Sequence, residues 1–221
     1  MSTSDEVNIR LRGDGSIFVE EYKDGVKSFK AITPDSLLGC INASLSFGRV
    51  GSGLLPKNCL SFTADSDGSK DICILHPEDK ADITFLNAEY KDFPLPRLVF
   101  GFKVSNEGLI SSCRLGVIED SSMIKPETKM YRWPLSNVRG THICVGNNPL
   151  PKCKSTSTYT LSSLPYLIIG IPNNLDHFSA VNNRMGLEMR ELLELLKDKH
   201  QSYYYEHILV PSETTLASFI S

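Results

Sequence analysis

Apolar and polar residues alternate along much of the first half of this 221-residue chain, a pattern typical of half-buried β-strands. Val7, Ile9 and Leu11 alternate with polar residues, and similar patterns predict further strands at 17–22 and 26–32. Thr33-Pro34 then favours the start of a helix, because threonine caps well and proline suits the first helical turn. We therefore expect a β-hairpin and helix extension over residues 1–53.

A second group of short strands follows the glycine-rich stretch 48–53, which we interpret as a connector. Its strands are expected at 59–63, 72–74, 83–90, 98–104 and 109–117. Consecutive strands joined by short turns favour an antiparallel meander of about four strands. Residues 54–221 are therefore predicted to form one α+β domain in which helices flank the meander.

The pattern changes after the last of these strands. Residues 119–163 have weak periodicity, and a long irregular segment in a compact domain is usually functional or disordered. A helix is expected at about 186–199, and a final short helix within 211–220. The apolar stripe of the longer helix is formed by Met189, Leu192, Leu193 and Leu196. His76 lies beside a predicted turn and is interpreted as a surface residue.

The composition of the chain argues against nucleic-acid binding and against a membrane span. The net charge is 23 − 26 = −3, so the chain has no electrostatic footprint for nucleic acid. The first residues are polar and acidic, unlike a signal peptide, and no apolar run approaches the ~20 residues of a membrane span. We therefore expect a cytoplasmic protein that does not bind a membrane, whose six cysteines are thiols.

One cysteine has surroundings suited to chemistry. Cys144 lies within the polar segment 134–148, where glycines and asparagines flank it. An acyl-bearing thiol needs an accessible sulfur and neutral hydrogen-bond donors for a developing oxyanion. The alternative interpretation is a buried cysteine at the end of a strand. His142-x-Cys144 with Cys153 matches no common zinc spacing, so no structural metal is expected.

This order of a meander, an irregular loop and helices resembles the ubiquitin-conjugating enzymes. In that family an asparagine precedes the catalytic cysteine, with a hydrophobic residue and a glycine between them. An aliphatic residue directly precedes the cysteine. Those places are taken here by Asn137, Val138, Gly140, Ile143 and Cys144. Leu135-Ser136 replaces the family's His-Pro, and the spacing from asparagine to cysteine is one residue shorter.

The chain is more similar to a divergent bacterial group, prokaryotic ubiquitin-conjugating-enzyme family D, over about Leu95 to Lys199. One member of that group, protein B, belongs to PRTRC-type plasmid operons, which implies a link to mobile genetic elements. The group lacks the upstream histidine and has a histidine downstream of the cysteine, which would be His177 here. The similarity rests on Pro126-x-Thr128-x-Met130-Tyr131-x-x-Pro134-x-x-Asn137-Val138 and on Cys144-x-Gly146.

The resemblance implies a role for each of these residues. Cys144 would carry the modifier as a thioester, and Asn137 would bind the oxyanion formed when a lysine attacks. His177, oriented by Asp176, would deprotonate the attacking amine. Asn137 would otherwise be a turn residue, and His177 would otherwise cap a helix.

Other residues could share these roles. Asn147 and Asn148 are weaker alternatives to Asn137 for the oxyanion. His142 lies two residues before Cys144, which on an extended segment puts both side chains on one face. A Cys144–His142 pair is therefore a second way to activate the thiol.

The resemblance thus implies a bacterial conjugating enzyme that passes a ubiquitin-like protein from Cys144 to a lysine. Its partners would be that ubiquitin-like protein, an adenylating activating enzyme and a protein substrate bearing the lysine. Such an enzyme would need no metal or organic cofactor of its own. A catalytically silent fold that acts as a protein-binding module is the alternative. A cysteine hydrolase that uses Cys144 and His177 is a third interpretation.

Overall fold

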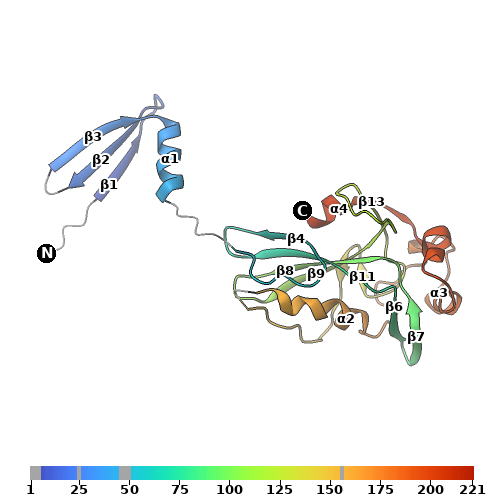
Figure 1. Cartoon of the computed structure of the whole chain (residues 1–221). Coiled ribbons are helices and arrows are strands. Elements are labelled where there is room, and N and C mark those ends of the chain that lie inside the picture. The colour runs from blue at the N-terminus through green and yellow to red at the C-terminus, as the bar shows by residue number, and fades with distance from the viewer. Residues whose placement is uncertain (1–5, 24–25, 45–50, 155–156) are drawn as a thin grey trace. The chain divides into compact units, whose positions relative to one another are not determined.

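The computed structural model describes residues 6–23, 26–44, 51–154 and 157–221 (Figure 1). The chain divides into two compact units, Met1–Gly51 and Ser52–Ser221. Each unit is described by itself below. Among the residues that the structure describes, no helix is long and apolar enough to cross a membrane.

The first unit is a three-stranded antiparallel sheet followed by a helix. The strands are β1 (Glu6–Leu11), β2 (Ile17–Lys23) and β3 (Val26–Ile32), in that order across the sheet. Helix α1 (Pro34–Ser44) follows directly, and the Thr33 hydroxyl accepts a hydrogen bond of 3.1 Å from the backbone N–H of Ser36. The threonine cap and the alternating strands are thus those expected from the sequence.

The second unit is built on the predicted antiparallel meander. Its four central strands are β4 (Cys59–Ala64), β5 (Lys70–Leu75), β8 (Leu98–Val104) and β9 (Ile110–Ile118). They lie in the order β4-β5-β8-β9, and every neighbouring pair is antiparallel. The α+β fold class is confirmed.

A hairpin interrupts the meander between β5 and β8, where the sequence pattern predicted a single strand over 83–90. It consists of β6 (Lys80–Phe85) and β7 (Ala88–Pro94). The prediction was wrong because Leu86 takes a left-handed φ of 53° and turns the chain within that apolar run. Pro94 is tolerated at the end of a two-stranded hairpin, where a missing donor costs little.

Short strands and helices follow β9. The strands are β10 (Lys129–Tyr131), β11 (Val138–Arg139), β12 (His142–Ile143) and β13 (Pro211–Thr215). The helices are α2 (Leu164–Ile169), α3 (Met189–Leu196) and α4 (Leu216–Ile220). Single turns of 3-10 or π type occupy Tyr159–Ser163, Ala180–Asn182 and Tyr204–Ile208.

Two predicted helices differ from the observed ones. Helix α3 is shorter than 186–199, since Gly186 has a φ of +63° and Glu188 caps the helix through a reciprocal bond with Glu191. The first half of the helix expected within 211–220 is instead strand β13. This segment becomes extended because it pairs with β10, a contact between distant parts of the chain.

The meander buries an apolar core on each face. One core lies between the sheet, α2 and α3, and the other lies under α4. Phe219 of α4 packs where Gly101 and Gly116 leave the sheet without side chains, since a Cβ at either position would lie 3.4 Å from its ring. Small residues in the strands thus let the last helix approach closely.

His76 belongs to the first core, so its interpretation as a surface residue was wrong. The side chain is 3% exposed, and its ring packs edge-on against Phe100 and against Tyr166 of α2. Neither ring nitrogen has a hydrogen-bond partner within the described part of the chain. The turn beside His76 could not reveal this, because the residue that covers it lies far along the sequence.

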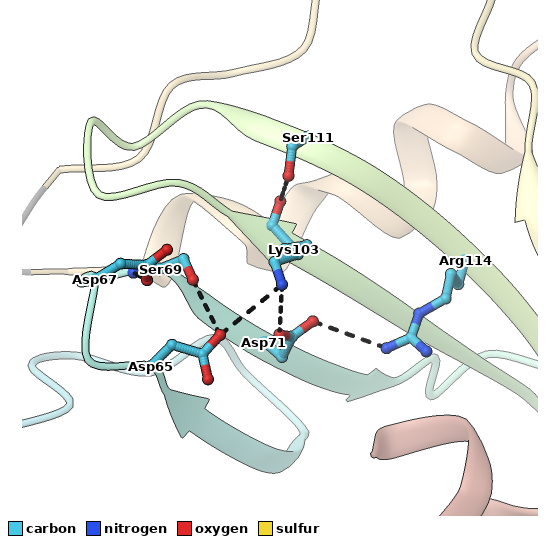
Figure 2. A network of polar contacts seen from close by, with 7 residues as sticks. All are labelled: Asp65, Asp67, Ser69, Asp71, Lys103, Ser111 and Arg114. Atoms are coloured by element: carbon cyan, nitrogen blue, oxygen red, sulfur yellow. Dashed lines mark hydrogen bonds and ion pairs between the residues drawn. The ribbon is translucent and has the colours of Figure 1, made fainter.

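Beside α4, the second face of the sheet carries charges. Figure 2 shows Lys103 between two carboxylates, with its Nζ 3.8 Å from Asp65 and 3.7 Å from Asp71. Arg114 reaches Asp71 at 3.9 Å and also lies over the Phe219 ring. These partly exposed ion pairs cover the sheet where α4 ends.

Candidate active site

The predicted cysteine follows a two-stranded hairpin on the edge of the meander. In this hairpin Val138 pairs with Ile143, and Arg139 pairs with His142. The turn between the strands begins with Gly140 at a φ of +64°, which glycine adopts without strain. Strand β12 pairs with β9, and the N–H of Leu115 donates to the carbonyl of Thr141 at 2.7 Å. The last strand of the meander therefore positions the hairpin.

Asn137 and Cys144 face each other across the open end of this hairpin. The backbone N–H of Cys144 donates to the carbonyl oxygen of Asn137 at 2.8 Å, which continues the pairing by one step. The Cys144 side chain is exposed, and that of Asn137 is half-buried. Both residues also line the same small pocket. The structure thus brings together the two residues that the motif singled out.

Two further hydrogen bonds tie Asn137 to the segment 172–176. It takes a left-handed φ of 63°, and its N–H donates to the carbonyl of Asp176 at 2.9 Å. Its side-chain Nδ2 donates to the carbonyl of Pro172 at 3.0 Å. A primary amide has two N–H donors, and the second one has no acceptor among the residues that the structure describes. The side chain therefore does not bond its own turn, as the simpler interpretation supposed.

Buried hydrogen bonds around Ser136 and Asn173 stabilise the segment that precedes Asn137. The Ser136 hydroxyl, 1% exposed, donates to Oδ1 of Asn173 at 2.9 Å. The Trp133 indole N–H donates to the carbonyl of Ser136 at 3.0 Å. Asn173 is also tied to hairpin β6–β7, because its N–H donates to the Thr84 carbonyl at 2.7 Å. These hydrogen bonds could not be predicted from the sequence. The only indication was that Ser136 occupies the position where the ubiquitin-conjugating enzymes have proline.

His177 lies on the segment that packs beside Asn137. It directly follows Asp176, whose carbonyl accepts the Asn137 bond, and it has a left-handed φ of 59°. The imidazole is exposed and makes no hydrogen bond to any residue that the structure describes. The Asp176 carboxylate instead accepts from Nδ2 of Asn174 at 2.8 Å. The structure therefore places the Asp176-His177 pair at this site without a bond between the two side chains.

The remaining candidates border the site less closely. His142 is exposed on β12 and pairs with Arg114 of β9. Nδ2 of Asn148 donates to the carbonyl of Val145 at 2.8 Å, so that amide stabilises its own turn. Asn147 is exposed and makes no side-chain hydrogen bond within the described residues.

Cys144 is exposed, whereas most of the other cysteines are fully or partly buried. Loss of solvent around the thiol raises the pKa of Cys73 to about 12 and that of Cys113 to about 11. It also raises the pKa of Cys59 and of Cys153. These four thiols are poor nucleophiles, because the thiolate is the reactive form. Cys40 is exposed, but it lies in the first unit, outside the E2-like meander.

A small apolar pocket adjoins Cys144. Its lining includes Leu135, Val138, Ile143 and Ile168, and its volume is about 30 Å³. That volume holds no more than one or two water molecules. Any larger group bound to the sulfur must lie on the protein surface. Among the described residues, no cluster of three or more histidine, cysteine or acidic side chains could hold a metal ion.

An antiparallel meander that ends in such an asparagine–cysteine hairpin defines an E2-like protein, with the fold of ubiquitin-conjugating enzymes. The model of prokaryotic E2 family D matches residues 41–212, so the chain belongs to that family. Neither the curated proteins nor the solved structures that were compared contain a match to this chain.

Proposed function

We propose that this protein carries a ubiquitin-like modifier as a thioester on Cys144 and transfers it to a lysine of another protein. The observation that carries the proposal is the exposed Cys144 opposite Asn137, which keeps one amide N–H available. Membership of the E2-like family supports ubiquitin-like modifiers and activating enzymes as partners in general. The small pocket beside the thiol also favours a macromolecular acyl group that lies on the surface.

Two acyl transfers make up the proposed reaction. The Cys144 thiolate attacks the thioester carbonyl held by the activating enzyme, a new C–S bond forms, and the enzyme's thiolate leaves. A lysine amine then attacks the Cys144 thioester, a C–N bond forms, the C–S bond breaks, and the amine loses a proton. In this proposal His177, which follows the Asp176 bonded to Asn137, accepts that proton.

Asn137 acts in the second transfer. Its free N–H donates to the oxyanion that develops when the amine attacks, and one such donor contributes about 2.7–4 kcal/mol to transition-state stabilisation. The bonds from Asn137 to Asp176 and Pro172 keep the amide in place beforehand, so little reorganisation is needed. A hydrolase function is less well supported, since it needs His177 to activate the thiol, and no hydrogen bond joins His177 to Cys144 within the described residues.

The test is direct detection of the adduct. The full chain is incubated with activating enzyme, ATP and modifier, and is analysed by mass spectrometry with and without excess thiol. We expect one modifier mass that thiol removes, and an adduct resistant to thiol in Cys144→Ser, where an ester replaces the thioester.

Cys153→Ser is the matched control. Cys153 is buried, and its loss should leave charging intact. If Cys153→Ser blocked charging while Cys144→Ser did not, the carrier residue would be misassigned. No adduct at all, with a demonstrably charged activating enzyme, would favour the binding-module function.

A further inference from the structure

A second, larger groove borders the hairpin that carries Cys144. Its volume is about 560 Å³, and hairpin β11–β12 forms one of its walls, with β10 and β13 opposite. The side chains that matter here are Arg132, Trp133, Arg139, His142, Ser212 and Thr214. It is large enough to hold several side chains of a bound peptide.

The groove carries positive charge that the described residues do not neutralise. Arg132 and Arg139 are exposed, and neither side chain makes an ion pair or hydrogen bond within the part of the chain described. None of the residues that line the groove is acidic. The nearest acidic residue along β13 is Glu213, and side chains alternate along a strand. Because Ser212 and Thr214 line the groove, Glu213 projects to the other side.

This donor set suits a carboxylate. Arginine presents several N–H donors in a planar fork that matches carboxylate geometry, and hydroxyl groups can supply further donors. The groove offers two such forks. The hydroxyls of Ser212 and Thr214 bond each other at 2.7 Å, which leaves one hydroxyl hydrogen as a further donor. The single tryptophan adds an apolar surface for the stem of an acidic side chain.

The position of the groove points to the acceptor protein rather than to the modifier. His142 lines the groove and lies two residues before Cys144, a span of about 7 Å on an extended chain. Cys144 itself is not part of the groove lining. A bound segment can therefore occupy the groove while the sulfur and its acyl group stay accessible. The acceptor must meet this condition, because its lysine attacks the carbonyl of a thioester already formed on Cys144.

We propose that this groove binds an acidic segment of the acceptor protein, close in sequence to the lysine that is modified. The assignment of the segment to the acceptor rests on the proposed conjugating function. The groove thereby selects lysines that have glutamate or aspartate nearby. Arg132 and Arg139 are specificity residues in this scheme and have no part in the acyl transfer itself.

Binding to the uncharged full-length protein tests the groove directly. The probe is a ten-residue peptide with a central lysine and four flanking glutamates, compared with a peptide in which glutamines replace the glutamates. Trp133 lines the groove, so its fluorescence reports occupancy. We expect the glutamate peptide to bind more tightly, and Arg132→Gln/Arg139→Gln to weaken its binding about tenfold. Salt should also weaken it.

Two controls isolate the effect of groove charge. Arg132→Lys/Arg139→Lys keeps the charge and should restore part of the affinity. Lys152→Gln/Lys154→Gln removes the same charge from exposed residues outside the groove lining and should change nothing. Equal binding of the two peptides, or equal affinity for wild type and Arg132→Gln/Arg139→Gln, would overturn the proposal.

Single-turnover transfer of the modifier shows whether the groove binds the acceptor protein or the modifier. With charged protein, the glutamate peptide should accept the modifier faster than the glutamine peptide, and Arg132→Gln/Arg139→Gln should abolish the difference while charging stays normal. Slower charging with normal discharge would assign the groove to the modifier and overturn the acceptor assignment. The expected peptide binding without any thioester on Cys144 would support the carboxylate site but contradict the proposed conjugating function.

Discussion

Asn137 and Cys144 are joined by one backbone hydrogen bond, so the hairpin sets their separation independently of their side chains. The side chains supply the reactive groups. Cys144 contributes an exposed thiol, and Asn137 contributes an amide whose second N–H has no acceptor among the described residues. The two left-handed residues of the site, Asn137 and His177, lie on adjacent segments joined by the bond from Asn137 to Asp176. Strained conformations of this kind often gather at functional sites.

The first residue-scale prediction concerns Asn137→Ala. We expect charging of Cys144 to stay nearly intact and discharge to lysine to slow by about 10²–10³-fold, since the lost donor acts on the oxyanion of the second transfer. Single-turnover assays of each step measure this. Asn148→Ala is the control, because that amide bonds its own turn. Lost charging with normal discharge would mean that Asn137 only supports the loop.

A second residue-scale prediction concerns pH and His76. Burial lowers the pKa of His76 and so favours the neutral ring in the folded state. The unfolded chain then takes up a proton near the ordinary pKa of about 6.5. Stability should therefore be fully present above this pH and should fall as the pH drops below it.

Thermal melting between pH 7.5 and 5.5 checks the role of His76. His76→Phe keeps a ring against Phe100 and Tyr166 but removes the titrating group, so its melting temperature should fall less on acidification. His177→Gln, which changes an exposed histidine without a hydrogen bond within the described residues, serves as the control. An identical slope in wild type and His76→Phe would contradict the assignment.

At the scale of elements, α4 depends on how closely it approaches the sheet. Phe219 is 4% exposed and fills the space above Gly101 and Gly116. Phe219→Ala should lower the free energy of unfolding by about 3–5 kcal/mol, because it removes a large ring and leaves a cavity. Urea unfolding measures the change. Tyr159→Ala, at an exposed aromatic residue, should cost less than about 0.5 kcal/mol.

The ion pairs on the same face should contribute far less. Lys103 is 47% exposed, and both of its carboxylate partners lie more than 3.5 Å from its Nζ (Figure 2). Exposed pairs of this kind contribute about 0–1 kcal/mol each. Lys103→Met should thus change the free energy of unfolding by no more than about 1 kcal/mol in the same urea assay. A loss as large as that of Phe219→Ala would show that the network is stronger than its geometry indicates.

At the scale of the whole molecule, the two units differ in how they are stabilised. Both apolar cores draw all of their members from residue 59 onward. In the first unit, Val7, Leu11, Val26 and Phe29 are each more than half exposed. The second unit therefore holds the apolar burial that folding requires.

We accordingly predict that a chain of residues 52–221 folds without the first unit. Its calorimetric melting transition should be cooperative and lie within a few degrees of the main transition of the full chain, because its cores are complete. Met1–Gly51 alone should show a much weaker transition. A fragment 52–221 without any cooperative transition would contradict this division of stability.

Much of the architecture could be predicted because it follows from local pattern. Alternation at Leu98, Phe100 and Phe102 indicates a strand whatever surrounds it, and Thr33-Pro34 starts a helix through its own backbone chemistry. The spacing from Asn137 to Cys144 likewise indicates a family and a candidate thiol without reference to distant residues. Each of these features depends on the types and spacing of a few neighbouring residues, so the sequence by itself determines them.

Other features depend on residues far apart in the chain. His76 is buried by Tyr166, and β13 is extended because it pairs with β10. The supports of Asn137 come from Pro172 and Asp176, and Arg132 joins Arg139 in a groove only through the arrangement of β10 and β11. Burial, strand pairing and charge clustering arise when such segments meet in space. Only the tertiary structure decides them, because no local pattern records which distant residue will be the neighbour.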